Sequence, residues 1–151
     1  MFVLLAQLAR RRPTPSPPRG GRGALQIRHV DAGSCNGCEH ELQATMNPFY
    51  DLARFGFGIT ASPRHADVLL VTGPVTRAMR GPLQAAHAAM SEPRTVAALG
   101  DCALGRVLCG LPEAGLVRVD EVLPVDLRIP GCPPTPEAIA EHLLEHRARR
   151  R

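Results

Sequence analysis

The chain has 151 residues, the size of one domain, with 18 Lys and Arg against 14 Asp and Glu. Its excess of positive charge, +4 overall, is concentrated in arginines near the two ends. Such ends are typical of solvated tails, or of surfaces attracted to an anionic membrane face or an acidic partner. The aromatic content is only 3%, with no Trp and no DNA-binding motif, which argues against a nucleic-acid partner.

Targeting signals are not predicted. The longest apolar run, from Phe2 to Leu5 with a few neighbours, is too short to cross a bilayer. Positive charges follow this run instead of preceding it, unlike a secretory signal, and the arginines at 10–12 precede a Pro/Ser/Gly-rich stretch, unlike a twin-arginine signal. We therefore expect a cytoplasmic protein, in which five cysteines indicate metal binding or chemistry more than disulfides.

The composition divides the chain at residue 23. Residues 1–12 could form a short amphipathic helix, and residues 13–23 are a linker rich in Pro, Gly and Arg. This N-terminal segment either docks on a membrane subunit, with its arginines at the lipid headgroups, or stays disordered. The folded domain is expected to comprise residues 24–151.

Short apolar runs in this domain predict buried strands over 25–30, 66–72, 95–99 and 124–129. Helices are predicted over 39–47, where Pro48 stops the helix, over 77–91, and after Thr135, which suits an N-cap, up to about Arg147. Because Pro82 lies inside the second of these, its regular part is expected to begin there. Segments 51–57 and 103–118 show no clear pattern.

Strands that alternate with helices imply βαβ units and a parallel sheet. In such sheets, ligands bind beyond the carboxyl ends of the strands. Three loops that follow predicted strands carry cysteines, and the loop with Gly73 and Pro74 leaves a fourth strand. We therefore expect all four loops at one edge of the sheet.

Four cysteines occur in these loops: Cys35 and Cys38 as a C-x-x-C pair, then Cys102, then Cys132 before two prolines. Thiolates are the ligands of iron–sulfur clusters, and a four-iron cluster usually takes four of them. Cys109 does not follow a strand directly, so we treat it as structural or spare, although it could replace Cys102. The grouping favours a cluster site.

Other interpretations remain open at this point. A structural zinc site would accept four thiolates but prefers two compact pairs, and such a zinc-bound interaction module would have no redox role. A redox C-x-x-C motif would leave Cys102 and Cys132 unexplained. Unrelated cysteines buried as small apolar side chains are the simplest alternative. Spacing alone places the cluster modestly ahead of zinc.

Five separated segments together resemble one family, the small cluster-bearing subunit shared by complex I (NADH:quinone oxidoreductase) and [NiFe] hydrogenases. They are Asp31-Ala-Gly-Ser-Cys-Asn-Gly-Cys-Glu39, 63–67, 71–76, Gly100-Asp-Cys102 and 129–134. The likeness is greatest to energy-converting hydrogenases and formate hydrogenlyase. The complex I subunits have adjacent cysteines in the first motif, whereas Cys35 and Cys38 are separated by two residues, as in hydrogenase-type subunits.

The resemblance implies a flavodoxin-like, three-layer α/β fold with a mainly parallel sheet. It also implies a single [4Fe–4S] cluster held by Cys35, Cys38, Cys102 and Cys132. The chain would be an electron-transfer subunit, not catalytic alone, of a membrane-associated [NiFe]-hydrogenase-like or complex I-like oxidoreductase. A quinone-reducing NADH dehydrogenase is the alternative within this class.

The same resemblance implies a hetero-oligomer. Its partners would be a large catalytic subunit, a ferredoxin-like subunit and membrane subunits, with the chain peripheral on the inner face of the cell membrane.

Glu39, beside the cysteine pair, has two interpretations. An acid suits the start of a helix, where it interacts favourably with the helix dipole. Alternatively, Glu39 is a proton-carrying carboxylate near the subunit interface. Arg64, His65 and Asp67 precede a strand and are expected to be structural or interfacial.

Overall fold

The structure is a computed structural model of the chain, and it describes residues 24–106 and 115–149. The predicted N-terminal segment, residues 1–23, and Cys109 lie outside these ranges. Within them, no helix combines the length and the apolar character needed to cross a bilayer.

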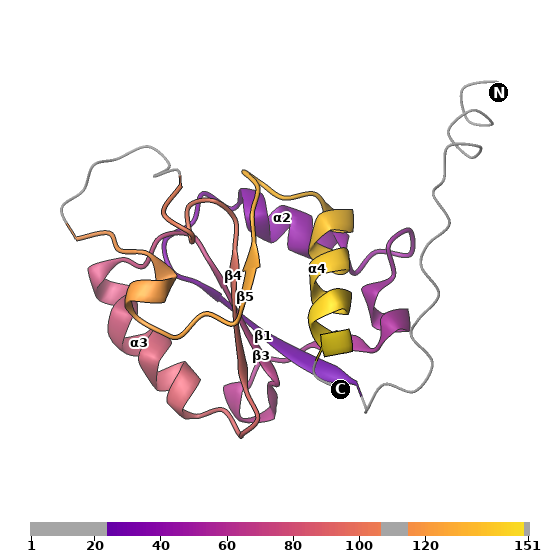
Figure 1. The fold of residues 1–151 in the computed structure, drawn as a ribbon, viewed down its shortest axis with the longest axis horizontal. Helices are drawn as coiled ribbons and strands as arrows, with labels where there is room; N and C mark the ends of the chain where they lie inside the picture. Colours follow the sequence, from indigo (N-terminus) through magenta and orange to yellow (C-terminus); the bar gives the residue numbers. More distant parts are fainter. Residues whose placement is uncertain (1–23, 107–114, 150–151) are drawn as a thin grey trace.

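A parallel sheet forms the centre of the domain (Figure 1). Its strands are β1 (Leu25–Asp31), β2 (Phe57–Ile59), β3 (Val68–Thr72), β4 (Thr95–Leu99) and β5 (Leu127–Ile129). They lie in the order β2-β1-β3-β4-β5, and every neighbouring pair is parallel. This is the strand order of flavodoxin-like folds, so the predicted fold class is confirmed.

The two central strands are buried on both faces. Every residue of β3 and β4 is buried. Val68 and Leu70 pack into one core, whereas Leu69 and Val71 pack into the other, because successive side chains of a strand point to opposite faces. A continuous apolar run is therefore what both strands require.

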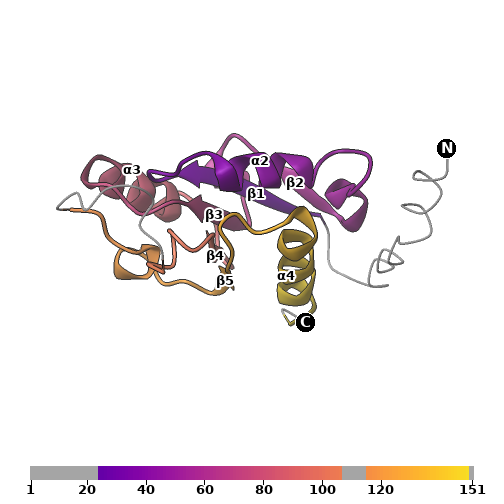
Figure 2. The ribbon, with the colours of Figure 1, turned by 90° about the horizontal axis from the view of Figure 1, so that it is seen from above.

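Helices cover both faces of the sheet, which gives three layers (Figures 1 and 2). Helix α3 (Arg77–Ala88) buries Leu83 against one face. Helices α2 (Gly37–Ala44) and α4 (Pro136–Arg149) lie on the other face, where Leu42 of α2 and Ile139 of α4 pack into the core that contains Val68 and Leu70.

Local sequence signals explain where two of these helices begin. Ala138 N–H donates to Thr135 Oγ1 at 3.3 Å, so Thr135 caps α4 as predicted. The prediction that the regular part of α3 begins at Pro82 is wrong, because the helix begins at Arg77. Thr76 caps this earlier start by accepting a hydrogen bond from Met79 N–H, and Pro82 removes only one bond from the helical ladder.

The sequence did not predict several short elements. These are β2 and the 3-10 helices Leu52–Phe55, Pro63–His65 and Val119–Glu121. Strand β2 has three residues with Gly58 at its centre, too few to show an alternating pattern. Strand β5 is shorter than the predicted 124–129, because only its last three residues pair with β4. Asp67 accepts a hydrogen bond from Gln26 N–H at 2.7 Å, which fits the structural role expected for it.

Truncation of Leu70 should test the buried core. Leu70 is fully buried, so Leu70→Ala is expected to lower the free energy of unfolding by about 2–5 kcal/mol in urea denaturation. Ile59 at the sheet edge is 48% exposed, and Ile59→Ala should cost less than about 1 kcal/mol. Equal losses from the two variants would contradict the assigned layers.

Candidate metal centre

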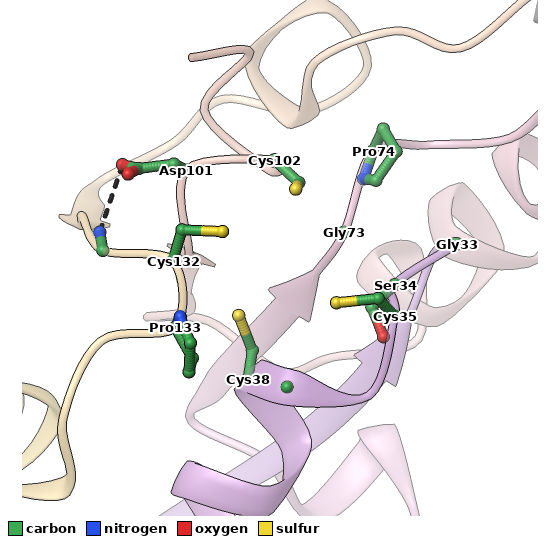
Figure 3. Close-up of a pocket in the computed structure, with 12 residues that line it drawn as sticks. Gly33, Ser34, Cys35, Cys38, Gly73, Pro74, Asp101, Cys102, Cys132 and Pro133 are labelled. Atoms are coloured by element: carbon green, nitrogen blue, oxygen red, sulfur yellow. Dashed lines mark hydrogen bonds between the residues drawn. The ribbon is translucent and has the colours of Figure 1, made fainter. Parts of the chain in front are cut away.

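The four predicted cysteines lie together at the carboxyl end of the sheet. Cys35 precedes α2, Cys38 is in the first turn of α2, Cys102 follows β4 and Cys132 follows β5. Their sulfur atoms point into one gap from different sides (Figure 3). The loop with Gly73 and Pro74 lines the same gap, as the sequence predicted.

The site has a buried side and an open side. Cys102 is buried and Cys38 is half-buried, whereas Cys35 and Cys132 are exposed. No disulfide joins these four cysteines, so all four sulfurs can bind a common ligand. The exposed pair leaves one side of the site open to solvent.

Gly100 allows the sulfur of Cys38 to approach the backbone. It has φ +92, and a Cβ at this position would lie 2.5 Å from Cys38 Sγ. Any other residue would both strain the backbone and collide with the thiol. In the sequence, Gly100 stands out only as part of the Gly100-Asp-Cys102 motif. Its position directly after the last residue of β4 was the available signal that the backbone turns there.

Asp101 connects the loops that carry Cys102 and Cys132. Its carboxylate accepts a hydrogen bond from Gly131 N–H at 3.1 Å (Figure 3), and its own N–H donates to the Gly131 carbonyl at 2.8 Å. Gly100 N–H also donates to the Ile129 carbonyl at 2.8 Å. These bonds fix the positions of two of the four cysteines relative to each other.

A tight turn holds the loop of the first pair. Asp31 Oδ1 accepts hydrogen bonds from Gly33 N–H at 2.8 Å and Ser34 N–H at 2.7 Å. Asn36 then adopts a left-handed conformation with φ 68, immediately before α2 begins. This path places Cys35 at the rim and turns Cys38 inward.

Glu39 lies in the first turn of α2, in agreement with the helix-start interpretation, but it is also buried in a network. Its side chain is 12% exposed. Ser34 Oγ donates to Glu39 Oε1 at 2.7 Å, and Thr72 Oγ1 donates to the same oxygen. His29 Nε2 lies 3.5 Å from it, whereas Glu39 Oε2 is buried without a partner.

Sequence reasoning missed His29 and Thr72. Each lies on a strand. Side chains two residues apart on a strand point to the same face, so the position of Thr72 two residues after Leu70 on β3 was the only signal that Thr72 points toward α2. The sequence could not show that β1 and β3 are neighbours paired in register, with Asp31 opposite Thr72.

The thiols influence one another electrostatically. Burial raises the pKa of the Cys38 thiol to about 12, and negative charge on Glu39 and on the other three cysteines adds to the rise. In the metal-free protein, Cys38 is therefore a neutral thiol at pH 7. A metal group must displace its proton to bind the sulfur.

Two kinds of metal group could use these thiols. Zinc binds sulfur at about 2.3 Å, so its ligands must converge closely on one point. In the part of the chain that the structure describes, no three His, Cys, Asp or Glu side chains form such a group. A four-iron cube takes one thiolate for each iron, and four thiols line one gap here.

The fold and the site define a class of protein: a flavodoxin-like α/β domain that gathers four thiols at the carboxyl edge of its sheet. Residues 35–146 match the protein family described as "NADH ubiquinone oxidoreductase, 20 Kd subunit". The chain belongs to this family of oxidoreductase subunits, which confirms the resemblance found in the sequence.

Named relatives include subunits of both hydrogenases and quinone reductases. The chain is 44% identical to the probable membrane-bound hydrogenase subunit mbhJ of Pyrococcus furiosus over 111 residues, 74% of this chain and 66% of the relative. It is 45% identical to formate hydrogenlyase subunit 7 of Escherichia coli, over 74% of this chain and 44% of the relative.

It is also 44% identical to an NADH-quinone oxidoreductase subunit of Flavobacterium johnsoniae, over 75% of this chain and 61% of the relative. The chain thus spans less than two thirds of the length of each of these relatives.

Solved structures share the fold. A chain of the membrane-bound sulfane sulfur reductase, an archaeal respiratory membrane complex, aligns with a TM-score of 0.70 and 30% identity, over 85% of this chain and 72% of that chain. A chain of an NAD+-reducing [NiFe]-hydrogenase aligns with a TM-score of 0.64 over 85% of this chain and 93% of that chain. Its identity of 21% shows the fold alone.

Asp101 offers a test of the loop arrangement. Asp101→Ala removes the acceptor for Gly131 N–H and is expected to lower the free energy of unfolding by about 1–3 kcal/mol, measured by urea denaturation. Asp101→Asn keeps an acceptor oxygen and should lose less than half of that. Identical losses in the two variants would show that the hydrogen bond does not hold the loops.

Proposed function

We propose that the chain binds one [4Fe–4S] cluster through Cys35, Cys38, Cys102 and Cys132. One observation supports this most strongly: four thiols from loops far apart in the sequence face a single gap (Figure 3). Membership of an oxidoreductase subunit family supports a shared redox cofactor as the ligand of these thiols. The spacing favours a cluster over the zinc-bound alternative, because structural zinc prefers two compact cysteine pairs and these four thiols come from one pair and two single cysteines.

The residues around the gap would define the environment of the cluster. Cys102 would hold its buried side, and the close approach at Gly100 would place backbone next to the Cys38 sulfur. When bound, the cluster would accept and pass on one electron at a time. Burial and hydrogen bonds to sulfur tune the potential of such a group, so these contacts would help to set it.

We propose that the chain acts as an electron-transfer subunit of a larger oxidoreductase and is not catalytic alone. The exposed side of the site, at Cys35 and Cys132, suits coverage by a large catalytic subunit. A ferredoxin-like subunit and membrane subunits would complete the hetero-oligomer. The chain would be cytoplasmic and peripheral on the inner face of the membrane. Relatives that are named as subunits of membrane-bound complexes support this assembly.

The first cysteine pair favours the hydrogenase type over a quinone-reducing NADH dehydrogenase. Two residues separate Cys35 from Cys38, whereas complex I subunits have adjacent cysteines. Overall identity does not separate the two types, because it is 44% to a hydrogenase subunit and 44% to a quinone reductase subunit. Nickel-binding cysteines in the co-purifying large subunit would support the hydrogenase type, and their absence would support the alternative.

Serine variants test the cluster. The protein purified without oxygen should be brown and contain about four iron atoms per chain. Cys102→Ser and Cys132→Ser should each lose or convert the cluster, because each removes one thiolate from a set of four. Iron analysis and visible absorption measure the outcome.

Cys109→Ser is the matched control, since Cys109 is the cysteine expected not to bind the cluster. This variant should keep the colour and the iron of the unaltered protein. A colourless protein that contains zinc would overturn the proposal. Normal iron content in Cys102→Ser together with its loss in Cys109→Ser would reassign the third ligand.

A further inference from the structure

The first cysteine pair has a capacity that the proposed cluster does not use. Cys35 is exposed and precedes α2, whereas Cys38 is half-buried in the first turn of the same helix. A C-x-x-C pair at the start of a helix is the motif with which disulfide oxidoreductases exchange thiols and disulfides. As cluster ligands, the two sulfurs would act separately, each on its own iron. The motif also allows them to react with each other.

The chain turns between the two cysteines. Asn36 has a left-handed conformation with φ 68, and α2 begins at Gly37. A turn brings residues three apart to a Cα separation below about 7 Å, the range in which a disulfide can form. A Cβ added to Gly37 would lie 3.6 Å from Cys35 Sγ. The sulfur of Cys35 therefore lies over the start of the helix, beside the residue that adjoins Cys38.

The backbone on both sides of the pair is anchored. Asp31 holds the backbone of Gly33 and Ser34 through two hydrogen bonds. Gly73 packs against the same loop, since a Cβ at this position would lie 2.4 Å from Ser34 N. Leu42 anchors α2 in the core. Rotation of the two cysteine side chains, which already point into one gap (Figure 3), is thus the movement that would join their sulfurs.

Pairings with the other two cysteines are less favourable. Cys102 and Cys132 lie on loops that follow β4 and β5, and Asp101 and Gly131 bond these loops to each other. A disulfide from either of them to the first pair would close a much longer loop, at a greater cost in chain entropy. It would also have to draw together loops that are anchored separately.

We propose that, in the chain without a cluster, Cys35 and Cys38 form a reversible disulfide that closes the site to iron. The oxidant is a small-molecule disulfide of the glutathione type. The Cys35 thiolate attacks one sulfur of this disulfide, and the first glutathione thiol leaves. Cys38 then loses its proton and attacks Cys35 Sγ, which releases the second glutathione thiol. The pair thus gives up two electrons and two protons, and both are carried away on the two glutathione thiols.

The oxidised pair cannot hold a cluster. Its sulfurs are bonded to each other at about 2.05 Å, so neither is a thiolate that could bind iron. Cys102 and Cys132 alone would supply two ligands, where a four-iron cluster takes four. A dithiol reductant reverses the exchange and returns both sulfurs to the site. In a reducing compartment, disulfides of this kind are transient and redox-sensing. This inference rests on the proposed function, because it states when the site can accept its cluster.

Peptide mass spectrometry tests the pairing. The full chain, prepared without a cluster, is exposed to oxidised glutathione, alkylated and digested with trypsin, which cuts after arginine. Cys35 and Cys38 then fall together on the peptide 29–54. The other cysteines fall on the separate peptides 95–106, 107–118 and 129–147. The expected disulfide is internal, so peptide 29–54 should escape alkylation and be lighter than its reduced form by two hydrogens.

Cluster loading tests the closure of the site. Given ferrous iron and sulfide without oxygen, the reduced chain should turn brown. The oxidised chain should lose this ability until dithiothreitol is added.

Serine variants identify the pair. Cys35→Ser and Cys38→Ser should each lose the internal disulfide. Cys132→Ser should keep it, because both members of the pair remain. Cys109→Ser is the matched control, and it should form the disulfide and load iron after reduction as the unaltered chain does.

The outcomes separate this inference from the proposed function. A reduced chain that takes up no iron would refute the proposed function itself. A reduced chain that turns brown, together with an oxidised chain whose peptide 29–54 is alkylated or joined to another peptide, would overturn the inference and leave the cluster intact. Full cluster loading of the internally disulfide-bonded chain without dithiothreitol would also overturn it.

Discussion

The parallel direction of every strand is the constraint on which the site depends. Because all neighbouring pairs in the sheet are parallel, the carboxyl ends of β1, β3, β4 and β5 lie at one edge. The loops that leave these ends supply all four thiols and the Gly73-Pro74 wall of the gap. An antiparallel strand in place of β4 or β5 would move its cysteine to the opposite edge, beyond reach of the others.

Burial on both faces of the sheet fixes the register of the strands that end at this edge. Continuous apolar runs in β3 and β4 fill two cores, so neither strand can slip by one residue without exchanging its faces. Asp101 then fixes the last two cysteine loops to each other, and Asp31 fixes the turn of the first. The hydrophobic core thus fixes which strand end each thiol follows. Hydrogen bonds to Asp31 and Asp101 then fix the conformation of the loops that carry the thiols.

The sequence predicted the elements whose patterns are long or strongly apolar. Strands β1, β3 and β4, the Thr135 cap and the convergence of the cysteine loops could be inferred from local residues. Strand β2 could not, because Phe57-Gly58-Ile59 is too short to show a period and pairs with β1 only through the tertiary fold. His29, Thr72 and Gly100 were missed for a related reason: their roles depend on neighbours far away in the sequence.

The wide separation of the cysteines has a mechanical consequence. Asp67 and Asp126 fasten the amino ends of the strands, since they accept hydrogen bonds from Gln26 N–H and Val96 N–H at 2.7 and 2.8 Å. A cofactor held by residues from 35 to 132 would cross-link the opposite ends and enclose most of the domain in closed loops. Such a cross-link lowers the conformational entropy of the unfolded chain more than it changes the folded structure. The prosthetic group would thereby serve as a fastener for the domain as well as a redox centre.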